Sequence, residues 1–279
     1  MSDNVRLPSL STFPRLLMHH AQMRPNHPAT REKDMGIWQT WTWSQVAEEV
    51  RAMASGLAEL GFKRGDNLAI IGDNRPRLYW AMCAAQCLGG VPVPLYQDAV
   101  AAEMVFVLQD AGIKFAIVED QEQVDKLLEN KSQCPDLLHI LYDDPRGLRH
   151  YNQSFLHGLD EVQEMGRIHN RNHPEFLDGE IDLGQPEDVA VMLYTSGTTG
   201  KPKGVCQTHA AFIAAAQSGC EFDKLVPGDN ILSYLPMAWV GDHLFSFAQA
   251  TYAGFTINCP ESGDTVMTDM REIGPSYYF

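Results

Sequence analysis

A segment rich in glycine and hydroxyl side chains, residues 194–204, has the composition of a polyphosphate-binding loop. Its candidate ligand-binding residues are Thr195, Ser196, Gly197, Thr198, Thr199, Gly200, Lys201 and Lys203. Glycines allow the backbone to turn tightly and to approach a ligand closely, and successive N–H groups in such a turn surround an anion. The hydroxyls add hydrogen-bond donors, and the lysines add positive charge. An apolar run at residues 189–194 predicts a buried strand that leads into the segment.

Two other interpretations of this segment are weaker. An ordinary surface loop is disfavoured because Ser-Gly-Thr-Thr-Gly-Lys rarely follows a strand by chance. A Walker A loop requires G-x-x-x-x-G-K-[ST], in which the hydroxyl after the lysine binds Mg²⁺. Here Gly197 and Gly200 are too close together, and Pro202 occupies the place of that hydroxyl residue. The sequence therefore disfavours a P-loop NTPase.

The segment resembles the phosphate-binding signature of the adenylate-forming superfamily, which includes acyl-CoA synthetases, luciferases and the adenylation domains of peptide synthetases. Three further segments resemble the same family in the same order. They are Ile-Ile-Gly-Asp-Asn-Arg at 70–75, Gly-Gly-Val-Pro-Val-Pro-Leu-Tyr at 89–96 and Leu-Pro-Met-Ala-Trp at 235–239. The resemblance covers nearly the whole chain and points most strongly to long-chain fatty-acid CoA ligases.

The resemblance implies an AMP-forming acid–thiol ligase, that is, an acyl-CoA synthetase. Such an enzyme activates a carboxylic acid with ATP, releases pyrophosphate, and passes the acyl group to the thiol of coenzyme A. ATP, Mg²⁺ and coenzyme A are therefore the expected cofactors and co-substrates. Residues 195–201 would bind the β- and γ-phosphates, whereas Lys203 could instead point to solvent. Mg²⁺ would bridge phosphate oxygens near Thr195 or Thr198, and no protein metal ligand is assigned.

The resemblance also places an acyl pocket beside residues 235–243. Trp239 is assigned to its wall, and His243 either lines the pocket or caps a helix. Amino-acid-activating relatives place an aspartate in this segment, but Asp242 does not match its position. A fatty or aromatic acid is therefore favoured over an amino acid.

Three motifs of the family are not found in the sequence. They are Tyr-Gly-x-Thr-Glu for adenine and Mg²⁺, Thr-Gly-Asp for the ribose, and a late catalytic lysine. We expect them beyond Phe279, so the chain would be the N-terminal portion of a ligase whose missing C-terminal part is its partner. With no catalytic residue assigned, we expect little turnover from this portion alone. The alternative is a naturally short, non-catalytic nucleotide-binding or interaction module of the same fold.

Composition excludes several other functions. A net charge of −15 argues against nucleic-acid binding and against simple docking on an anionic membrane. No run of eighteen apolar residues occurs, so we expect no transmembrane segment, although peripheral membrane contact stays open. Six cysteines without a C-x-x-C pair, and a polar N-terminus without signal-peptide features, favour a cytoplasmic protein. The expected small-molecule partners are a carboxylic acid and ATP.

Strand and helix patterns alternate from residue 65 onward, which predicts an α/β fold with mostly parallel sheets flanked by helices. By resemblance this is the N-terminal part of the large domain of an acyl-CoA synthetase. We divide it into a lobe at 1–142, a polar connection at 143–187, and a phosphate-loop and acyl-pocket lobe at 188–279. Ligands in such folds bind at the carboxyl ends of the strands, where residues 72–74 and 195–201 are both expected.

The element bounds follow from apolar periodicity and from turn residues. Helices are predicted at residues 13–23, 46–60, 77–88, 99–110, 121–130, 154–165, 210–219, 243–253 and 265–273. Strands are predicted at 68–71, 91–96, 115–118, 137–142, 205–208, 231–235 and 255–258, with a hairpin turning at 34–36. Trp38, Trp41 and Trp43 are expected to pack in the core rather than to form a ligand platform. His169 and His173 are expected in a solvated loop, without a metal.

Overall fold

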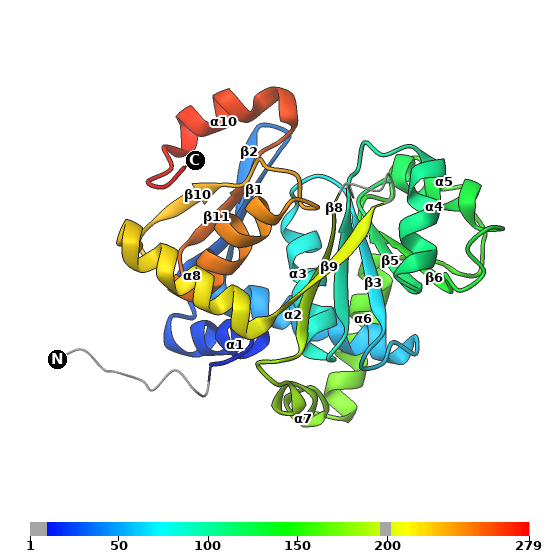
Figure 1. Cartoon of the computed structure of the whole chain (residues 1–279), viewed down its shortest axis with the longest axis horizontal. Helices are drawn as coiled ribbons and strands as arrows, with labels where there is room; N and C mark the ends of the chain where they lie inside the picture. The colour runs from blue at the N-terminus through cyan, green and yellow to red at the C-terminus, as the bar shows by residue number, and fades with distance from the viewer. Residues whose placement is uncertain (1–9, 196–201, 279) are drawn as a thin grey trace.

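The computed structural model describes residues 10–195 and 202–278, which form an α/β fold with two main sheets and one hairpin (Figure 1). Sheet I has the strand order β10-β11-β1-β2, and sheet II has the order β4-β3-β5-β6-β7. Strands β8 and β9 form the hairpin. Among the described residues, no helix is long and apolar enough to cross a membrane.

Sheet II is entirely parallel, and the sequence predicted four of its five strands. The fifth, at Leu156–Gly158, lies where a helix at 154–165 was predicted, so that prediction was wrong. Its strands are β3 (Asn67–Ile71), β4 (Val91–Leu95), β5 (Ile113–Val118), β6 (His139–Tyr142) and β7 (Leu156–Gly158). Its connecting helices are α3 (Pro76–Cys87), α4 (Ala101–Asp110) and α5 (Gln121–Asn130). Pro92 and Pro94 lie in β4, which is the last strand in the hydrogen-bonded order, as expected for prolines. Apolar residues pack on both faces of the sheet, as parallel sheets require.

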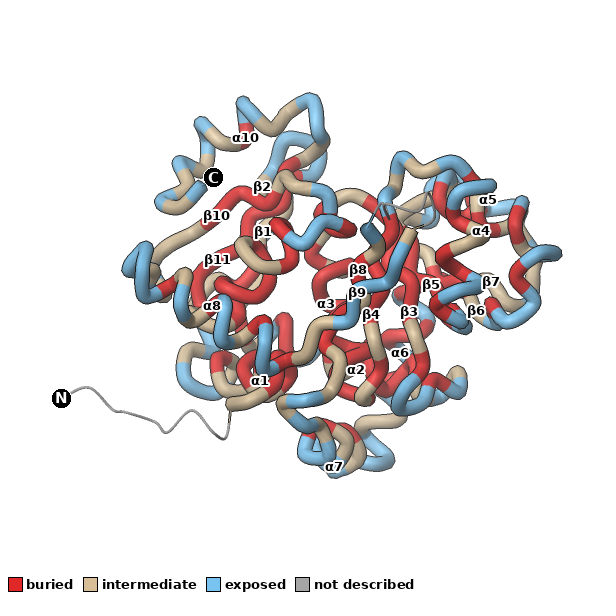
Figure 2. Tube along the Cα trace, viewed as in Figure 1, coloured by how far each residue is buried: buried red, intermediate tan, exposed pale blue. Residues whose placement is uncertain are grey.

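Sheet I joins the two ends of the chain. Its strands are β1 (Pro28–Asp34), β2 (Ile37–Thr42), β10 (Asn230–Leu232) and β11 (Thr256–Cys259). The predicted hairpin between β1 and β2 is confirmed, with positive φ at Met35 and Gly36. The associated helices are α1 (Phe13–Met23), α8 (His209–Asp223), the π-helical turn η2 (Asp242–Ala248), α9 (Gln249–Ala253), the 3₁₀ turn η3 (Gly263–Thr265) and α10 (Val266–Ile273). Figure 2 shows buried residues along both sheets, and exposed ones on α10 and β9.

Helix α2 (Trp43–Glu59) lies between the sheets and starts at the predicted capping box. The Thr42 hydroxyl accepts from the Gln45 N–H, and the Gln45 side chain accepts from the Thr42 N–H. Trp43 is buried against His20, with ring centroids 4.7 Å apart, which confirms its core role. Trp41 packs edge-on against Trp80, whereas the Trp38 indole donates to Glu272 near the surface.

The structure corrects the prediction for the polar stretch after residue 143. Residues 159–172 form a helix, α6 (Leu159–Asn172), which is followed by α7 (Phe176–Leu183). His169 therefore lies in a helix, and His173 caps it, so the prediction of a loop was wrong. The helix forms because it packs closely on α2: a Cβ atom on Gly166 would lie 1.7 Å from the carbonyl oxygen of Ala52. Among the described residues, no group of three or more His, Cys, Asp or Glu side chains is placed to bind a metal.

Candidate functional site

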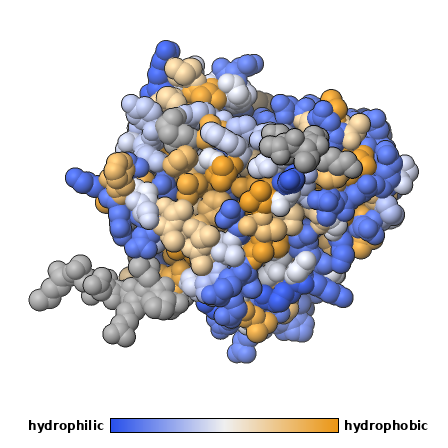
Figure 3. Space-filling view, in the orientation of Figure 1, coloured by the Kyte–Doolittle hydropathy of each residue, from blue (hydrophilic) through white to orange (hydrophobic). Residues whose placement is uncertain are grey.

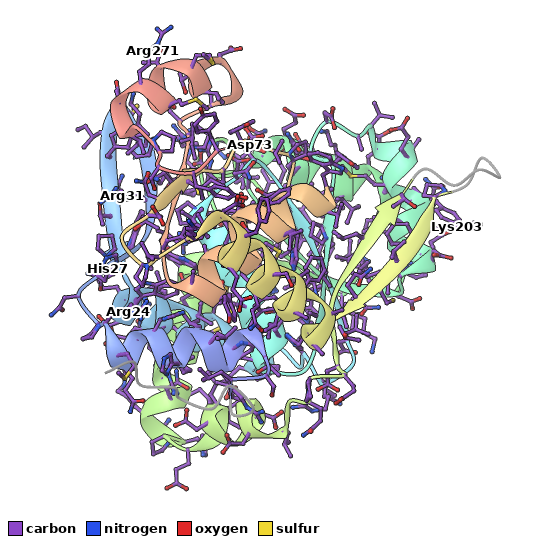
Figure 4. All side chains as sticks on the ribbon, turned by 60° about the vertical axis from the view of Figure 1, so that its left-hand side comes forward. Arg24, His27, Arg31, Asp73, Lys203 and Arg271 are labelled. Atoms are coloured by element: carbon purple, nitrogen blue, oxygen red, sulfur yellow. The ribbon has the colours of Figure 1, made fainter. Side chains whose placement is uncertain are left out.

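The hairpin of β8 (Val189–Thr195) and β9 (Lys203–Thr208) brings the two ends of the phosphate-loop motif together. Thr195 pairs with Lys203 in antiparallel register, which confirms a return strand rather than a helix after the loop. The predicted ligands Ser196, Gly197, Thr198, Thr199, Gly200 and Lys201 lie outside the described residues. Figure 4 shows Lys203 at the tip of the hairpin, away from the other labelled side chains.

Two contacts hold the hairpin in place. The Tyr194 hydroxyl donates to Asp110 Oδ2 at 2.7 Å, which attaches β8 to the end of α4. Gly204 faces Met192 and Tyr194 so closely that an added Cβ would meet Met192 Sδ at 3.0 Å. The hydrogen bond thus attaches the hairpin to α4, and the close packing holds its two strands together.

A pocket of about 210 Å³ opens between β4, α4 and the ends of the hairpin. Its lining is mainly apolar and includes Leu95, Met104, Val107, Thr195, Pro202 and Ala238. We call it the candidate pocket. Thr195 and Pro202 belong to the phosphate-loop motif and are the described residues on either side of 196–201, so the pocket adjoins that motif directly. Apart from this pocket, Figure 3 shows hydrophobic residues gathered in the middle of the drawn face, between α8 and the hairpin.

Residues 236–241, which we call the wall loop, follow β10 and contribute Ala238 to the candidate pocket. Trp239 is 47% exposed, and its ring packs across Gly241, where an added Cβ would lie 2.8 Å from the ring. The ring is not among the side chains that line the candidate pocket. The assignment of Trp239 to an acyl wall therefore stays a prediction.

His243 lies in the core at the start of η2 and is fully buried. Phe13, Phe212 and Phe247 surround its ring, with centroids 6.3, 4.7 and 5.0 Å away. Neither ring nitrogen has a hydrogen-bond partner among the described residues, and burial lowers the pKa of His243 to about 3. The imidazole is therefore neutral at physiological pH, and its assignment to the substrate pocket also stays a prediction.

The predicted rim segment 72–74 does lie at the carboxyl end of β3, near the top of Figure 4 where Asp73 is labelled. The Asp73 N–H donates to Glu119 Oε2 at 2.6 Å, and Gln97 donates to the Asp73 carboxylate at 2.9 Å. Residues from β3, β4 and β5 thus meet at one edge of sheet II, as parallel strands require.

A second, strongly charged cleft of about 670 Å³ lies at the strand ends of both sheets. Its lining includes Glu32, Arg75, Arg77, Glu119, Asp143 and Arg146, and we call it the charged cleft. Arg75 donates to Glu119 at 2.7 Å and to the carbonyl oxygens of Pro260 and Glu261 at 2.9 and 3.1 Å. It therefore ties the rim of sheet II to the end of β11 in sheet I. The sequence analysis did not assign this linking role to Arg75, although its position directly after the rim segment 72–74 could have indicated it.

Burial raises the pKa of Glu32 to about 7, although the nearby Arg75 guanidinium opposes the shift. Burial likewise raises the pKa of Asp143 to about 6, against the opposing effect of Arg77, 2.7 Å away. These carboxyls are paired with arginines, so the charged cleft has the character of an ion-pair network between the two sheets.

Comparison with known proteins identifies the family of the chain. The family model described as AMP-binding enzyme matches residues 17–279. The human protein named long-chain-fatty-acid–CoA ligase ACSBG1 is 27% identical over 248 residues, which cover 86% of this chain and 33% of that protein. FadD15 of Mycobacterium bovis, also named a long-chain-fatty-acid–CoA ligase, is 27% identical over 84% of this chain and 37% of its own length. The chain thus spans about a third of the length of these curated relatives.

Solved structures share the fold. The anthranilate CoA ligase AuaEII in complex with anthranoyl-AMP superposes with a TM-score of 0.81 at 19% identity, over 95% of this chain and 48% of that one. The long-chain-fatty-acid-CoA ligase FadD1 of Archaeoglobus fulgidus gives a TM-score of 0.75 at 16% identity, over 95% and 50% of the two chains. The match of the family model over residues 17–279 shows that the chain belongs to the AMP-binding enzyme family.

Proposed function

We propose that the chain forms the phosphate-binding and acyl-binding part of an AMP-forming acyl-CoA synthetase that acts on a long-chain fatty acid. One observation carries the proposal. A single apolar pocket is lined both by the residues that flank the phosphate-loop motif and by Ala238 of the wall loop. An acyl chain in this pocket would hold its carboxyl group close to the phosphate loop, which is the arrangement that adenylate formation needs.

The phosphate-loop residues would act by electrostatic stabilisation. Backbone N–H groups of Gly197 and Gly200, the hydroxyls of residues 195, 196, 198 and 199, and the Lys201 ammonium are donors suited to β- and γ-phosphate oxygens. Lys203, exposed at the tip of the hairpin, is a weaker candidate. ATP would supply the adenylyl group, Mg²⁺ would neutralise phosphate charge near Thr195 or Thr198, and coenzyme A would accept the acyl group. The residues of this chain bind and orient the phosphates while negative charge develops on them.

The acyl preference rests on the lining of the candidate pocket. Leu95, Met104 and Val107 offer apolar surface, which favours an alkyl chain over an amino acid. The relatives named above as long-chain-fatty-acid–CoA ligases agree with this preference. Because the adenine, ribose and lysine motifs of the family are not found in the sequence, we expect phosphate and acyl binding with little turnover.

Equilibrium binding to the intact chain tests the proposal with two probes, Mg²⁺–pyrophosphate and a fluorescent long-chain fatty acid. Lys201→Ala should weaken pyrophosphate binding at least tenfold and leave fatty-acid binding unchanged. Ala238→Phe should fill the candidate pocket, so it should weaken fatty-acid binding and leave pyrophosphate binding unchanged. Ala214→Phe, on the exposed face of α8, is the matched control and should change neither affinity. Failure of the wild-type chain to bind either probe, or equal effects of Ala238→Phe and Ala214→Phe, would contradict the proposal.

A further inference from the structure

One side chain holds both ends of the wall loop. The Asn74 amide nitrogen donates to the Leu235 carbonyl oxygen at 3.0 Å, directly before the loop. The same nitrogen lies 3.1 Å from Asp242 Oδ1, directly after the loop. Asn74 is 8% exposed and follows β3, so it links the wall loop to the rim of sheet II. One buried amide therefore bridges the two residues that flank the wall loop, Leu235 and Asp242.

Tyr79 completes this contact from α3. Its hydroxyl lies 2.8 and 2.9 Å from the two carboxyl oxygens of Asp242 and 2.8 Å from the Asn74 nitrogen. The two amide hydrogens of Asn74 are therefore shared among three acceptors, and the tyrosine hydroxyl accepts from Asn74 while it donates to Asp242. We call these three residues the Asn74–Tyr79–Asp242 network.

Asp242 is fully buried and has no cationic partner within the described parts of the chain. Burial raises its pKa to about 7, although the nearby donors Tyr79, Ser246 and Asn74 oppose the shift. The titratable groups that face it are Tyr79 from α3 and Cys259 from the end of β11, and burial raises the pKa of both. Its neighbour in sequence, His243, is neutral near pH 7. Asp242 is thus the group of this network that changes charge near neutral pH.

The wall loop connects the network to the candidate pocket. Inside the loop, the Trp239 N–H donates to the Pro236 carbonyl oxygen at 2.9 Å, and the Trp239 ring covers Gly241, next to Asp242. Ala238, between these contacts, lines the candidate pocket together with Thr195 and Pro202. A change in the hydrogen bonds of Asp242 therefore acts on the loop that carries Ala238.

We infer that Asp242 is a positioning residue: with Asn74 and Tyr79 it fixes the wall loop against sheet II and so sets the place of Ala238 in the candidate pocket. The inference deepens the proposed function and rests on it only for the identity of the ligand. Above neutral pH the carboxylate accepts charge-assisted hydrogen bonds from Tyr79 and Asn74 and holds the loop tightly. Below neutral pH the neutral acid accepts weaker hydrogen bonds from Tyr79 and Asn74, although protonation of the buried group stabilises the folded chain as a whole.

The fluorescence of Trp239 in the ligand-free chain tests the inference. The emission of the wild type minus that of Trp239→Phe should show one transition near pH 7. Asp242→Asn should abolish that transition. Glu32→Gln is the matched control, because Glu32 also has a pKa of about 7 but lies in the charged cleft, and it should retain the transition. A transition that persists in Asp242→Asn, or a wild type without one, would overturn the inference.

Tyr79→Phe keeps the test decisive if Asp242→Asn does not fold. Loss of a hydrogen bond to the ionised carboxyl should move the midpoint of the Trp239 transition upward by about one pH unit. An unchanged midpoint in Tyr79→Phe would contradict the network.

Ligand binding separates this inference from the proposed function. In Asp242→Asn the fluorescent fatty acid should bind about tenfold more weakly at pH 8, whereas Mg²⁺–pyrophosphate should bind as in the wild type. If the wild-type chain binds no fatty acid at any pH while the Trp239 transition occurs, the proposed substrate is wrong and the positioning role stands.

Discussion

Asp242 beside the wall loop and Glu32 in the charged cleft are two acids of similar pKa in different surroundings. Burial raises both pKa values to about 7. Asp242 is wholly enclosed, and the neutral donors Tyr79 and Asn74 hydrogen-bond to its carboxyl oxygens. Glu32 is 22% exposed and lies 3.7 Å from the Arg75 guanidinium, which also binds Glu119.

The difference separates two uses of a buried carboxyl at the strand ends. In the charged cleft, arginines offset the acids and join the two sheets, so we assign the cleft a structural role. Beside the candidate pocket, no cation offsets Asp242 within the described residues, so its protonation changes the hydrogen bonds that hold the wall loop. Each prediction below tests one side of this contrast.

The largest expected effect is on the charged cleft. Arg75→Met removes the group that pairs with Glu119 Oε1 and donates to the carbonyl oxygens of Pro260 and Glu261, directly after β11. We expect the free energy of unfolding in urea to fall by about 3 kcal/mol, the scale for breaking a buried ion pair. Arg146→Met in the same cleft is the control: Arg146 is 77% exposed, so its loss should cost less than about 1 kcal/mol. Equal losses in the two variants would refute the structural role of Arg75.

A smaller loss of stability is expected when the Asn74–Tyr79–Asp242 network is disturbed. Tyr79→Phe leaves Asp242 and Asn74 each without one hydrogen bond, so we expect a loss of about 1–2 kcal/mol in urea unfolding at pH 8. Tyr151→Phe removes a hydroxyl that donates to the exposed Asp125 at 2.6 Å and should change stability far less. A Tyr79→Phe chain as stable as Tyr151→Phe would show that the buried network contributes little.

The pH dependence of stability follows from the raised pKa values. A carboxyl whose pKa is higher in the folded chain than in the unfolded chain binds more protons when folded, so its contribution to stability falls as pH rises between the two values. For Asp242 the window runs from pH 4 to pH 7, with a slope of at most about 1.4 kcal/mol per pH unit. Asp242→Asn should therefore flatten the curve of thermal midpoint against pH in this window. Glu32→Gln should flatten it less, because Arg75 and solvent offset its charge. If Glu32→Gln flattens the curve more than Asp242→Asn does, the acid with the more strongly shifted pKa lies in the charged cleft and not beside the wall loop.

The smallest effect concerns the exposed end of the wall loop. Trp239→Phe should change the free energy of unfolding by less than about 0.5 kcal/mol, because the side chain is 47% exposed and makes few buried contacts. The measurement is urea unfolding at pH 8, where the carboxylate holds the loop. A loss above about 1.5 kcal/mol would place Trp239 among the core residues instead.

Local patterns in the sequence predicted much of the fold. The capping box at Thr42, the hairpin at residues 34–36 and the helix at 121–130 depend on neighbouring residues, and the structure confirms them. Helix α6 was predicted with the wrong bounds because its sequence is polar. It is stabilised by close packing of Gly166 on α2, more than 100 residues away in the chain.

The candidate site shows the same difference between local motifs, which the sequence reveals, and contacts between distant residues, which it does not. The phosphate-loop motif was identified from a contiguous stretch of residues, without help from the fold. The Asn74–Tyr79–Asp242 network could not be identified in this way, because Asn74 and Asp242 are 168 residues apart and meet only when the two sheets are assembled. Burial of Asp242, which gives it a pKa near neutrality, likewise depends on the packing of η2.

Photo-crosslinking with a long-chain fatty acid that carries a diazirine tests the central claim most directly. After irradiation of the wild-type chain and proteolysis, mass spectrometry identifies the labelled residues. We predict labels on the walls of the candidate pocket, at residues 94–107 and at Ala238, and their loss in Ala238→Phe. Labelling confined to the charged cleft, around Arg75 and Glu119, would show that the acyl-binding site has been assigned to the wrong one of the two regions.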